Sequence, residues 1–152
     1  MTRARRRPAV TALVESGRLQ EIAADQDEAR DLLDQAETHL RSAERLLDDD
    51  PAAAYQLAYD AARKATSADM LANGLRTRSD RPGAHAATVL YAEATFVDIA
   101  DADSLASFDQ MRRQRNRTEY GAAIVGREQR LADLGHAREL VRAVRSRFAA
   151  AQ

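Results

Sequence analysis

Four arginines lie close together in the segment FDQMRRQRNRTEYG, residues 108–121. They are Arg112, Arg113, Arg115 and Arg117. Guanidinium groups at this density suit phosphate binding, because each presents a planar fork of N–H donors. The same residues would also suit a solvated helix face, balanced by acidic neighbours such as Asp109 and Glu119. The segment therefore predicts either a site that handles phosphate or a surface of paired charges.

Helical periodicity separates Arg115 from the other three arginines. An apolar stripe leads to it in steps of three and four residues: Leu105, Phe108 and Met111. A guanidinium at the next step needs an acidic partner, a ligand or an interface, since an unpaired buried charge is costly. We therefore expect Arg115 to face a two-fold interface or a cleft beside it, and the other three arginines to lie on a solvated face.

The composition restricts the class of protein. The chain has 152 residues, of which 23 are basic and 24 acidic, so any basic function must be local. It contains no cysteine, which excludes disulfides and thiolate chemistry. The N-terminal MTRARRRPAV lacks the apolar run of a signal peptide, and no apolar stretch approaches the roughly 20 residues that span a bilayer. We expect a cytoplasmic protein with no membrane partner.

Apolar spacing predicts an all-α bundle of four to five main helices with no sheet. The two longest, 27–47 and 51–73, are joined by DDDP, in which Asp50 and Pro51 form an N-cap and first-turn pair, and they should form an antiparallel hairpin. A loop is predicted over 75–83. The remaining helices are expected over 85–97, from an N-cap at Ser104 to about 121, and over 127–150. Residues 1–24 are predicted to form a basic arm and a short amphipathic helix, and 25–152 the bundle.

Histidines and tyrosines are the other residues that could transfer protons or stack on a base. His85 follows a glycine-containing loop, where it could move protons or merely cap and pack a helix start. His39 and His136 flank apolar stripes and fit boundary positions. Three tyrosines at helical spacing fit the core better than a stacking platform: Tyr55, Tyr59 and Tyr91. The carboxylates at 48–50 fit a helix end, so neither a metal nor a cofactor is expected.

The segment RNRTEYG resembles the signature of the HEPN domain family, in which an Arg and a polar residue are followed after four to six residues by His. Arg115 and Asn116 match, and Tyr120 stands where the His is expected. The form RRxRNRxEY is most similar to that of actinobacterial members. Upstream, residues 52–87 resemble the family's helix of small and aromatic residues, its loop and its His-bearing helix start. The resemblance covers roughly residues 28–148.

The resemblance implies a HEPN-like up-and-down bundle that forms a homodimer, with two Arg motifs in one cleft. Active relatives are similar to metal-independent endoribonucleases, and many belong to toxin–antitoxin or defence modules beside a nucleotidyltransferase-like or antitoxin partner. By this resemblance the catalytic residues would be Arg115, Asn116 and Tyr120. The residues expected to contact RNA are Arg112, Arg113, Arg117 and His85.

Tyr120 is the departure that matters chemically. A phenol with a reference pKa of about 10 is a weak general base at neutral pH, although it can hydrogen-bond a phosphate or stack on a base. It could equally be a packed aromatic at a helix end. Three functions stay open: an RNA- or nucleotide-binding protein with weak or lost ribonuclease activity, an active endoribonuclease toxin using Arg115 and Tyr120, and a protein-interaction bundle with no nucleic-acid role.

Overall fold

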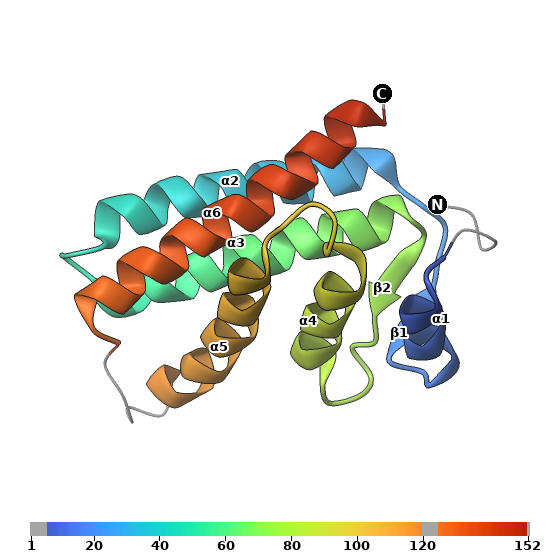
Figure 1. Ribbon diagram of the computed structural model, residues 1–152, viewed down its shortest axis with the longest axis horizontal. Helices are drawn as coiled ribbons and strands as arrows, with labels where there is room; N and C mark the ends of the chain where they lie inside the picture. Colours follow the sequence, from blue (N-terminus) through green and yellow to red (C-terminus); the bar gives the residue numbers. More distant parts are fainter. Residues whose placement is uncertain (1–5, 120–124, 152) are drawn as a thin grey trace.

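The computed structural model is an all-α bundle, as the apolar spacing predicts (Figure 1). It describes residues 6–119 and 125–151, and the side chains of Asn116, Thr118 and Glu119 also lie outside the description. Within the described residues there are six helices, one more than the four to five expected: α1 (Pro8–Glu15), α2 (Gln26–Leu46), α3 (Pro51–Ala72), α4 (Ala84–Thr95), α5 (Ala102–Glu119) and α6 (Arg127–Ala150). In the described part of the chain, no helix has the length and apolarity to cross a membrane.

The helices α2 and α3 form the predicted antiparallel hairpin. Each begins at a capping aspartate: Asp25 accepts the Glu28 N–H at 2.9 Å, and Asp50 accepts the Ala53 N–H at 3.2 Å. The buried stripe of α2 alternates small and large residues: Ala29, Leu33, Ala36, Leu40 and Ala43. Its steps of four and three keep one face against the partner helix.

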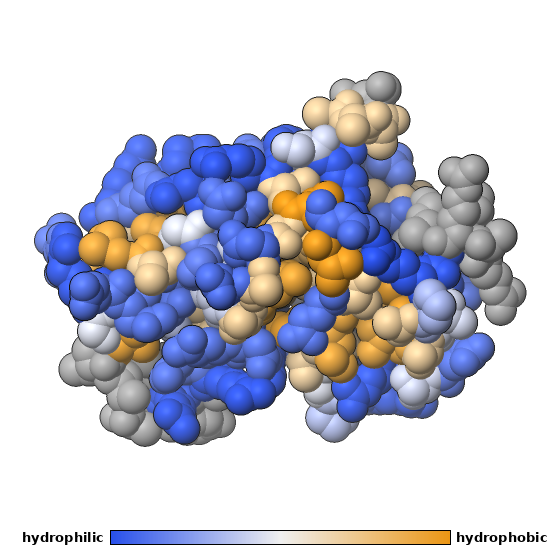
Figure 2. All heavy atoms as spheres, viewed as in Figure 1, coloured by the Kyte–Doolittle hydropathy of each residue, from blue (hydrophilic) through white to orange (hydrophobic). Residues whose placement is uncertain are grey.

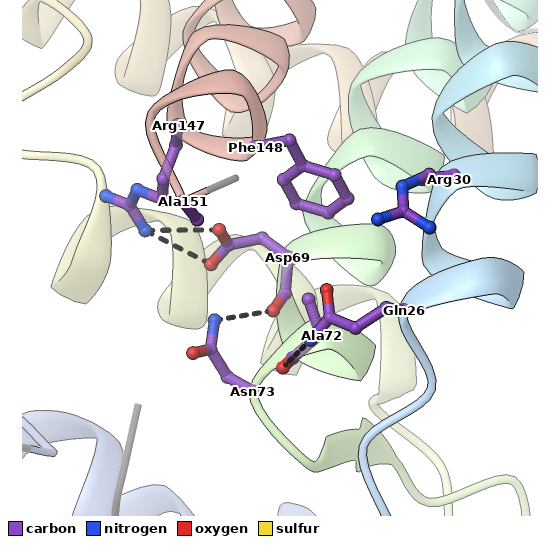
Figure 3. Close-up of a pocket in the computed structure, with 8 residues that line it drawn as sticks. All are labelled: Gln26, Arg30, Asp69, Ala72, Asn73, Arg147, Phe148 and Ala151. Carbon is purple, nitrogen blue, oxygen red and sulfur yellow. Dashed lines mark hydrogen bonds and ion pairs between the residues drawn. The ribbon is translucent and has the colours of Figure 1, made fainter.

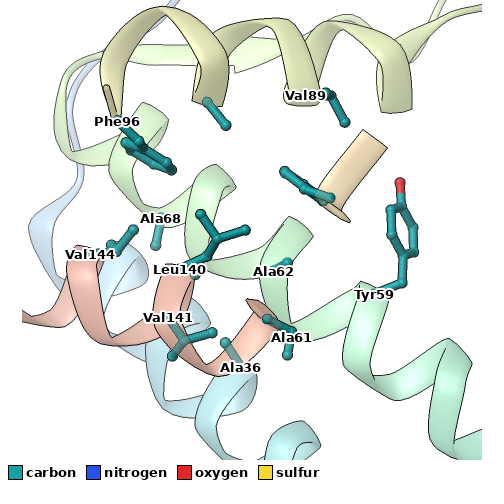
Figure 4. Close-up of a cluster of buried hydrophobic side chains, with 14 of the residues drawn as sticks. Ala36, Tyr59, Ala61, Ala62, Ala68, Val89, Phe96, Leu140, Val141 and Val144 are labelled. Atoms are coloured by element: carbon teal, nitrogen blue, oxygen red, sulfur yellow. The ribbon is translucent and has the colours of Figure 1, made fainter. Parts of the chain in front are cut away.

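The central helix of the bundle is α3, which contacts α2, α4, α5 and α6. Six of its alanines are buried: Ala54, Ala58, Ala61, Ala62, Ala65 and Ala68. A helix that is apolar around most of its circumference is an interior helix, and short side chains allow its neighbours to approach closely. Figure 4 shows the result, with residues of α2, α4 and α6 converging on α3.

The last helix, α6, runs antiparallel to α2. Ion pairs between the two segments show how the helices are aligned. Arg127 pairs with Asp48 at 2.8 Å near one end, and Arg145 pairs with Asp34 at 2.6 Å and Glu37 at 2.8 Å toward the other. These pairs are largely exposed, so water and salt screen them. They specify alignment more than stability.

A short antiparallel ribbon corrects the prediction that no strand is present. β1 (Leu19–Glu21) pairs with β2 (Leu75–Thr77), placing Leu19 opposite Thr77. Segment 75–77 lies in the predicted loop, and three residues are too few to show an alternating pattern. The ribbon fastens the chain before α2 to the chain after α3.

The predicted N-cap at Ser104 is also wrong. The helix α5 begins at Ala102, and Ser104 is buried inside its first turn. Its N–H donates to Asp101 Oδ1 at 2.7 Å, so Asp101 takes the capping role. The Ser104 hydroxyl instead lies 3.0 Å from His136 Nδ1 on α6, which explains why a polar residue is tolerated there.

Replacing Gly74 by Ala is expected to destabilise the protein by about 1–2 kcal/mol. Gly74 follows the α3 C-cap with φ of 73°, and an added Cβ would lie 3.0 Å from the Ile22 carbonyl oxygen. As a control, Gly135→Ala in α6, where the added methyl meets no atom within 4 Å, should be neutral or stabilising. Urea unfolding measures both variants; equal midpoints would refute the strain argument.

Candidate functional site

Three side chains from different helices meet at one end of the buried core: Tyr59 of α3, His85 of α4 and Arg115 of α5. The Tyr59 hydroxyl lies 2.5 Å from His85 Nδ1, and the two rings are nearly parallel, with centroids 5.7 Å apart. The Arg115 guanidinium lies over the Tyr59 ring, 5.6 Å from its centroid. We refer to these three residues as the Tyr59 cluster.

Local packing explains why the cluster forms. Tyr59 is fully buried and its ring packs against Phe108, with centroids 5.9 Å apart, so it is locked between α3 and α5. Figure 4 shows it at one edge of the apolar cluster, with its hydroxyl pointing toward the side on which α4 lies. His85 and Arg115 are half-buried, so each can reach both the tyrosine and solvent.

Further charges surround the cluster. On α3, Arg63 and Asp60 form a pair at 3.4 Å, and on α5, Arg112 approaches from the turn before Arg115. Burial lowers the pKa of His85, and the positive charges of Arg115 and Arg63 lower it further. Burial also raises the pKa of Tyr59 to about 12. At neutral pH both rings are therefore uncharged, and positive charge dominates around them.

The arginines of the 108–121 segment have different environments. Arg112 and Arg113 share one carboxylate, Asp109, at 2.9 Å and 2.8 Å, in the i, i+3 and i, i+4 geometry of a helix surface. Arg117 is exposed. Arg115 alone of these four lies against a buried aromatic ring, at the position where the apolar stripe of α5 would continue.

The other predicted site residues divide into two groups. His85, expected to contact RNA, contacts the same tyrosine as Arg115, and its predicted RNA contact stays a prediction. The Asn116 side chain and Tyr120 lie outside the described residues, so their predicted catalytic roles stay predictions. Tyr59 was expected only in the core; it is buried there, but its contacts with His85 and Arg115 were not foreseen, and no local sequence signal marks them.

The other two tyrosines in the described part of the chain bind buried carboxylates. Tyr55 donates to Asp133 at 2.8 Å, and Ser107 and Gln129 also donate to that carboxylate. Tyr91 donates to Asp69 at 2.7 Å. Such bonds satisfy acceptors that are nearly or completely removed from water, and this is their structural role.

Asp69 belongs to a second polar cluster that the sequence did not reveal (Figure 3). Arg147 of α6 donates to both Asp69 oxygens at 3.2 Å and to the Thr95 carbonyl at 2.9 Å, and its guanidinium lies over the Phe96 ring. The ion pair borders a pocket of about 360 Å³ between the ends of α2, α3 and α6. The polar groups of this second cluster bind one another and connect α3 and α4 to α6. We therefore assign the cluster a structural role.

The surface in Figure 2 is mostly hydrophilic, with an apolar patch near its centre over the α4–α5 connection and α6. Val97 and Ile99 belong to the α4–α5 connection and are 51% and 37% exposed. Among the described residues, no group of three or more His, Asp and Glu side chains is arranged to hold a metal ion.

Comparison of the chain with protein-family models, with curated proteins and with solved structures found no match. The features that bear on function are therefore the Tyr59 cluster and the motif that contains Arg115.

Proposed function

We propose that this chain is a HEPN-like protein that binds the phosphates of RNA, or of a nucleotide, at the Tyr59 cluster. The observation that supports the proposal most directly is the contact of Arg115 with Tyr59 beside His85. The motif arginine and an imidazole from another helix thereby contact the same tyrosine, and the arginine charge acts on the imidazole. A guanidinium and an imidazole are both phosphate-binding groups.

The local charge supports an anionic ligand. Arg63, Arg112 and Arg115 all act on the His85 imidazole and disfavour its protonation, while Asp60 opposes them. A phosphate placed among these groups would relieve repulsion between the guanidiniums and gain charge-assisted hydrogen bonds. Because the whole chain has a net charge of −1, this attraction is local to the cluster.

Binding with weak or lost cleavage is the main proposal, and metal-independent cleavage is the second candidate. In cleavage, the RNA 2′-oxygen would bond to the adjacent phosphorus as the 5′-oxygen leaves, giving a 2′,3′-cyclic phosphate. One group would take the 2′ proton and another would protonate the leaving oxygen. His85 favours this candidate, because it places an imidazole near Arg115 although Tyr120 replaces the motif histidine.

The biological setting follows from the resemblance alone. We propose a cytoplasmic homodimer in a toxin–antitoxin or defence module, with two Tyr59 clusters in one cleft and an antitoxin or nucleotidyltransferase-like partner. Light scattering tests the dimer, and the neighbouring genes test the module. If the protein is strictly monomeric, the proposed dimer cleft is refuted, and the phosphate site would have to lie within one chain.

The proposal predicts that end-labelled single-stranded RNA binds the full chain in EDTA, with an affinity that falls as salt rises. Cleavage should be slow or absent in EDTA and in magnesium alike. Tyr120→His should increase it near neutral pH, because imidazole carries protons there and a phenol does not. Product analysis should find a 2′,3′-cyclic phosphate.

The pH dependence identifies the proton carrier if the wild type cleaves. With Tyr120 as base, the rate should climb toward the phenol pKa and Tyr120→Phe should abolish it. With His85 as base, the ring would have to be the Nδ1–H tautomer, whose Nε2 lone pair is open to the 2′ proton. The rate should then level off by neutral pH, because the His85 pKa is lowered and the imidazole is already neutral. A chain that neither binds nor cleaves RNA at low salt would favour the protein-interaction bundle.

A further inference from the structure

Tyr59 cannot contact a ligand, because its side chain is fully buried. It nevertheless contacts the two cluster residues that a ligand can reach. Its hydroxyl is hydrogen-bonded to His85 Nδ1, and its ring carries the Arg115 guanidinium. Any influence of Tyr59 on ligand binding must therefore act through His85 and Arg115.

The direction of the hydrogen bond determines the state of His85. If the imidazole is neutral and the Tyr59 O–H donates to Nδ1, the ring proton resides on Nε2. If the imidazole is protonated, Nδ1–H donates to the Tyr59 oxygen instead. The charged groups that act on His85 are Arg63 and Asp60 of α3 and Arg112 and Arg115 of α5. Three of these four are cations, so the neutral ring is favoured. Of its two tautomers, the Nε2–H form gives the buried Tyr59 hydroxyl an acceptor at Nδ1, so we take Tyr59 as the donor.

Neutral His85 then has a defined donor for a ligand. Nδ1 bonds the Tyr59 hydroxyl, and in that tautomer Nε2–H is the ring donor for a ligand, since no partner for it is found among the described residues. The ring is half-buried, which gives solvent access without free rotation. Arg115 is held by the same tyrosine through its ring face.

We infer that Tyr59 is a positioning residue that fixes His85 as a neutral Nε2–H donor and holds Arg115 beside it, so that a phosphodiester meets a guanidinium and an imidazole N–H already arranged. The inference rests on the proposed phosphate site for its ligand, but the control of His85 by Tyr59 can be measured without any ligand. Preorganisation of this kind raises affinity because the ordering cost is met before binding.

The test compares wild type, Tyr59→Phe and Tyr55→Phe by ¹⁵N NMR of the histidine rings. The wild type should show His85 protonated on Nε2 at neutral pH. Tyr59→Phe removes a bond that stabilises neutral His85, so the His85 pKa should rise and the tautomers should mix. Tyr55→Phe is the matched control, because it also deletes a buried tyrosine hydroxyl, one bonded to Asp133, and should leave His85 unchanged.

Binding of a short single-stranded RNA to the same three proteins completes the test. Tyr59→Phe should weaken binding about five- to tenfold, which corresponds to one neutral hydrogen bond, while Tyr55→Phe should not. An Nδ1–H tautomer in the wild type, or an unchanged His85 spectrum and affinity in Tyr59→Phe, would overturn the inference. If the spectra change as expected but the wild type binds no RNA, the phosphate site fails while the control of His85 by Tyr59 is supported.

Discussion

Arg147→Met should lower the free energy of unfolding by about 3 kcal/mol at pH 7.5, the lower end of the loss when one member of a buried ion pair is removed, because the Arg147 side chain is 32% exposed. Asp69 is fully buried, and Arg147 is its cationic partner, bonded to both carboxylate oxygens at 3.2 Å. Without the guanidinium, the Tyr91 hydroxyl would remain as a neutral donor, which does not offset the loss of hydration of a full charge.

The loss should depend on pH. Burial raises the pKa of Asp69 above its ordinary 3.8, and Arg147 opposes this rise, so removing Arg147 should raise the pKa further. Over the pH range between the unfolded and folded pKa values, the folded state binds a proton that the unfolded state lacks. Stability therefore falls as pH rises through that range. Arg147→Met should accordingly recover part of its stability at pH 5.

Two further variants make the argument specific. Asp69→Asn in the Arg147→Met background removes the uncompensated charge and should restore much of the stability at pH 7.5. Arg142→Met deletes an exposed α6 arginine paired with Glu139, and should change stability by less than about 0.5 kcal/mol. Denaturant unfolding at both pH values measures all of these. A loss in Arg147→Met equal to that in Arg142→Met would show that the buried pair contributes little.

Much of the helical framework could be predicted from local sequence. The α2–α3 hairpin could be predicted because local signals agree. Apolar stripes mark both helices, and three residues mark helix ends: Asp50, Pro51 and Gly74. Gly74 follows the α3 C-cap with a positive φ, the conformation typical of a glycine that ends a helix. The stripe argument also singled out Arg115, which lies against a buried ring.

The unforeseen features depend on pairing between distant segments. Arg147 and Asp69 are 78 residues apart, and Tyr59 and His85 are 26 apart, so neither partner marks the other in the sequence. The ribbon of β1 and β2 likewise joins segments that are individually too short to show periodicity. Tertiary packing decides such pairs, and local propensity does not.

Arg115→Ala carries the second large expected effect. If the chain cleaves RNA, the rate should fall about a hundredfold, or roughly 3 kcal/mol, because a charged donor to the transition-state phosphate is removed. If it only binds RNA, Arg115→Ala should still weaken binding more than any other single arginine substitution in the 108–121 segment. Its position over Tyr59 and near His85 is the physical reason.

Arg112→Ala is the matched control, since it removes the same charge one helical turn away. Arg112 is paired with Asp109, which Arg113 also contacts, so deleting it leaves that carboxylate with a cationic partner. We expect an effect of only a few-fold on RNA binding or cleavage, mainly through long-range attraction that salt suppresses.

Stability must be measured for both variants, because Arg115 also packs on Tyr59. Loss of the contact between the Arg115 guanidinium and the Tyr59 ring should cost about 0.5–1 kcal/mol of folding free energy. This is too little to unfold the chain. Arg115→Lys separates charge from shape: a point charge keeps the attraction but loses the planar fork of donors. Equal defects in Arg115→Ala and Arg112→Ala would show that the segment acts as a diffuse basic surface, and the site at the Tyr59 cluster would then be abandoned.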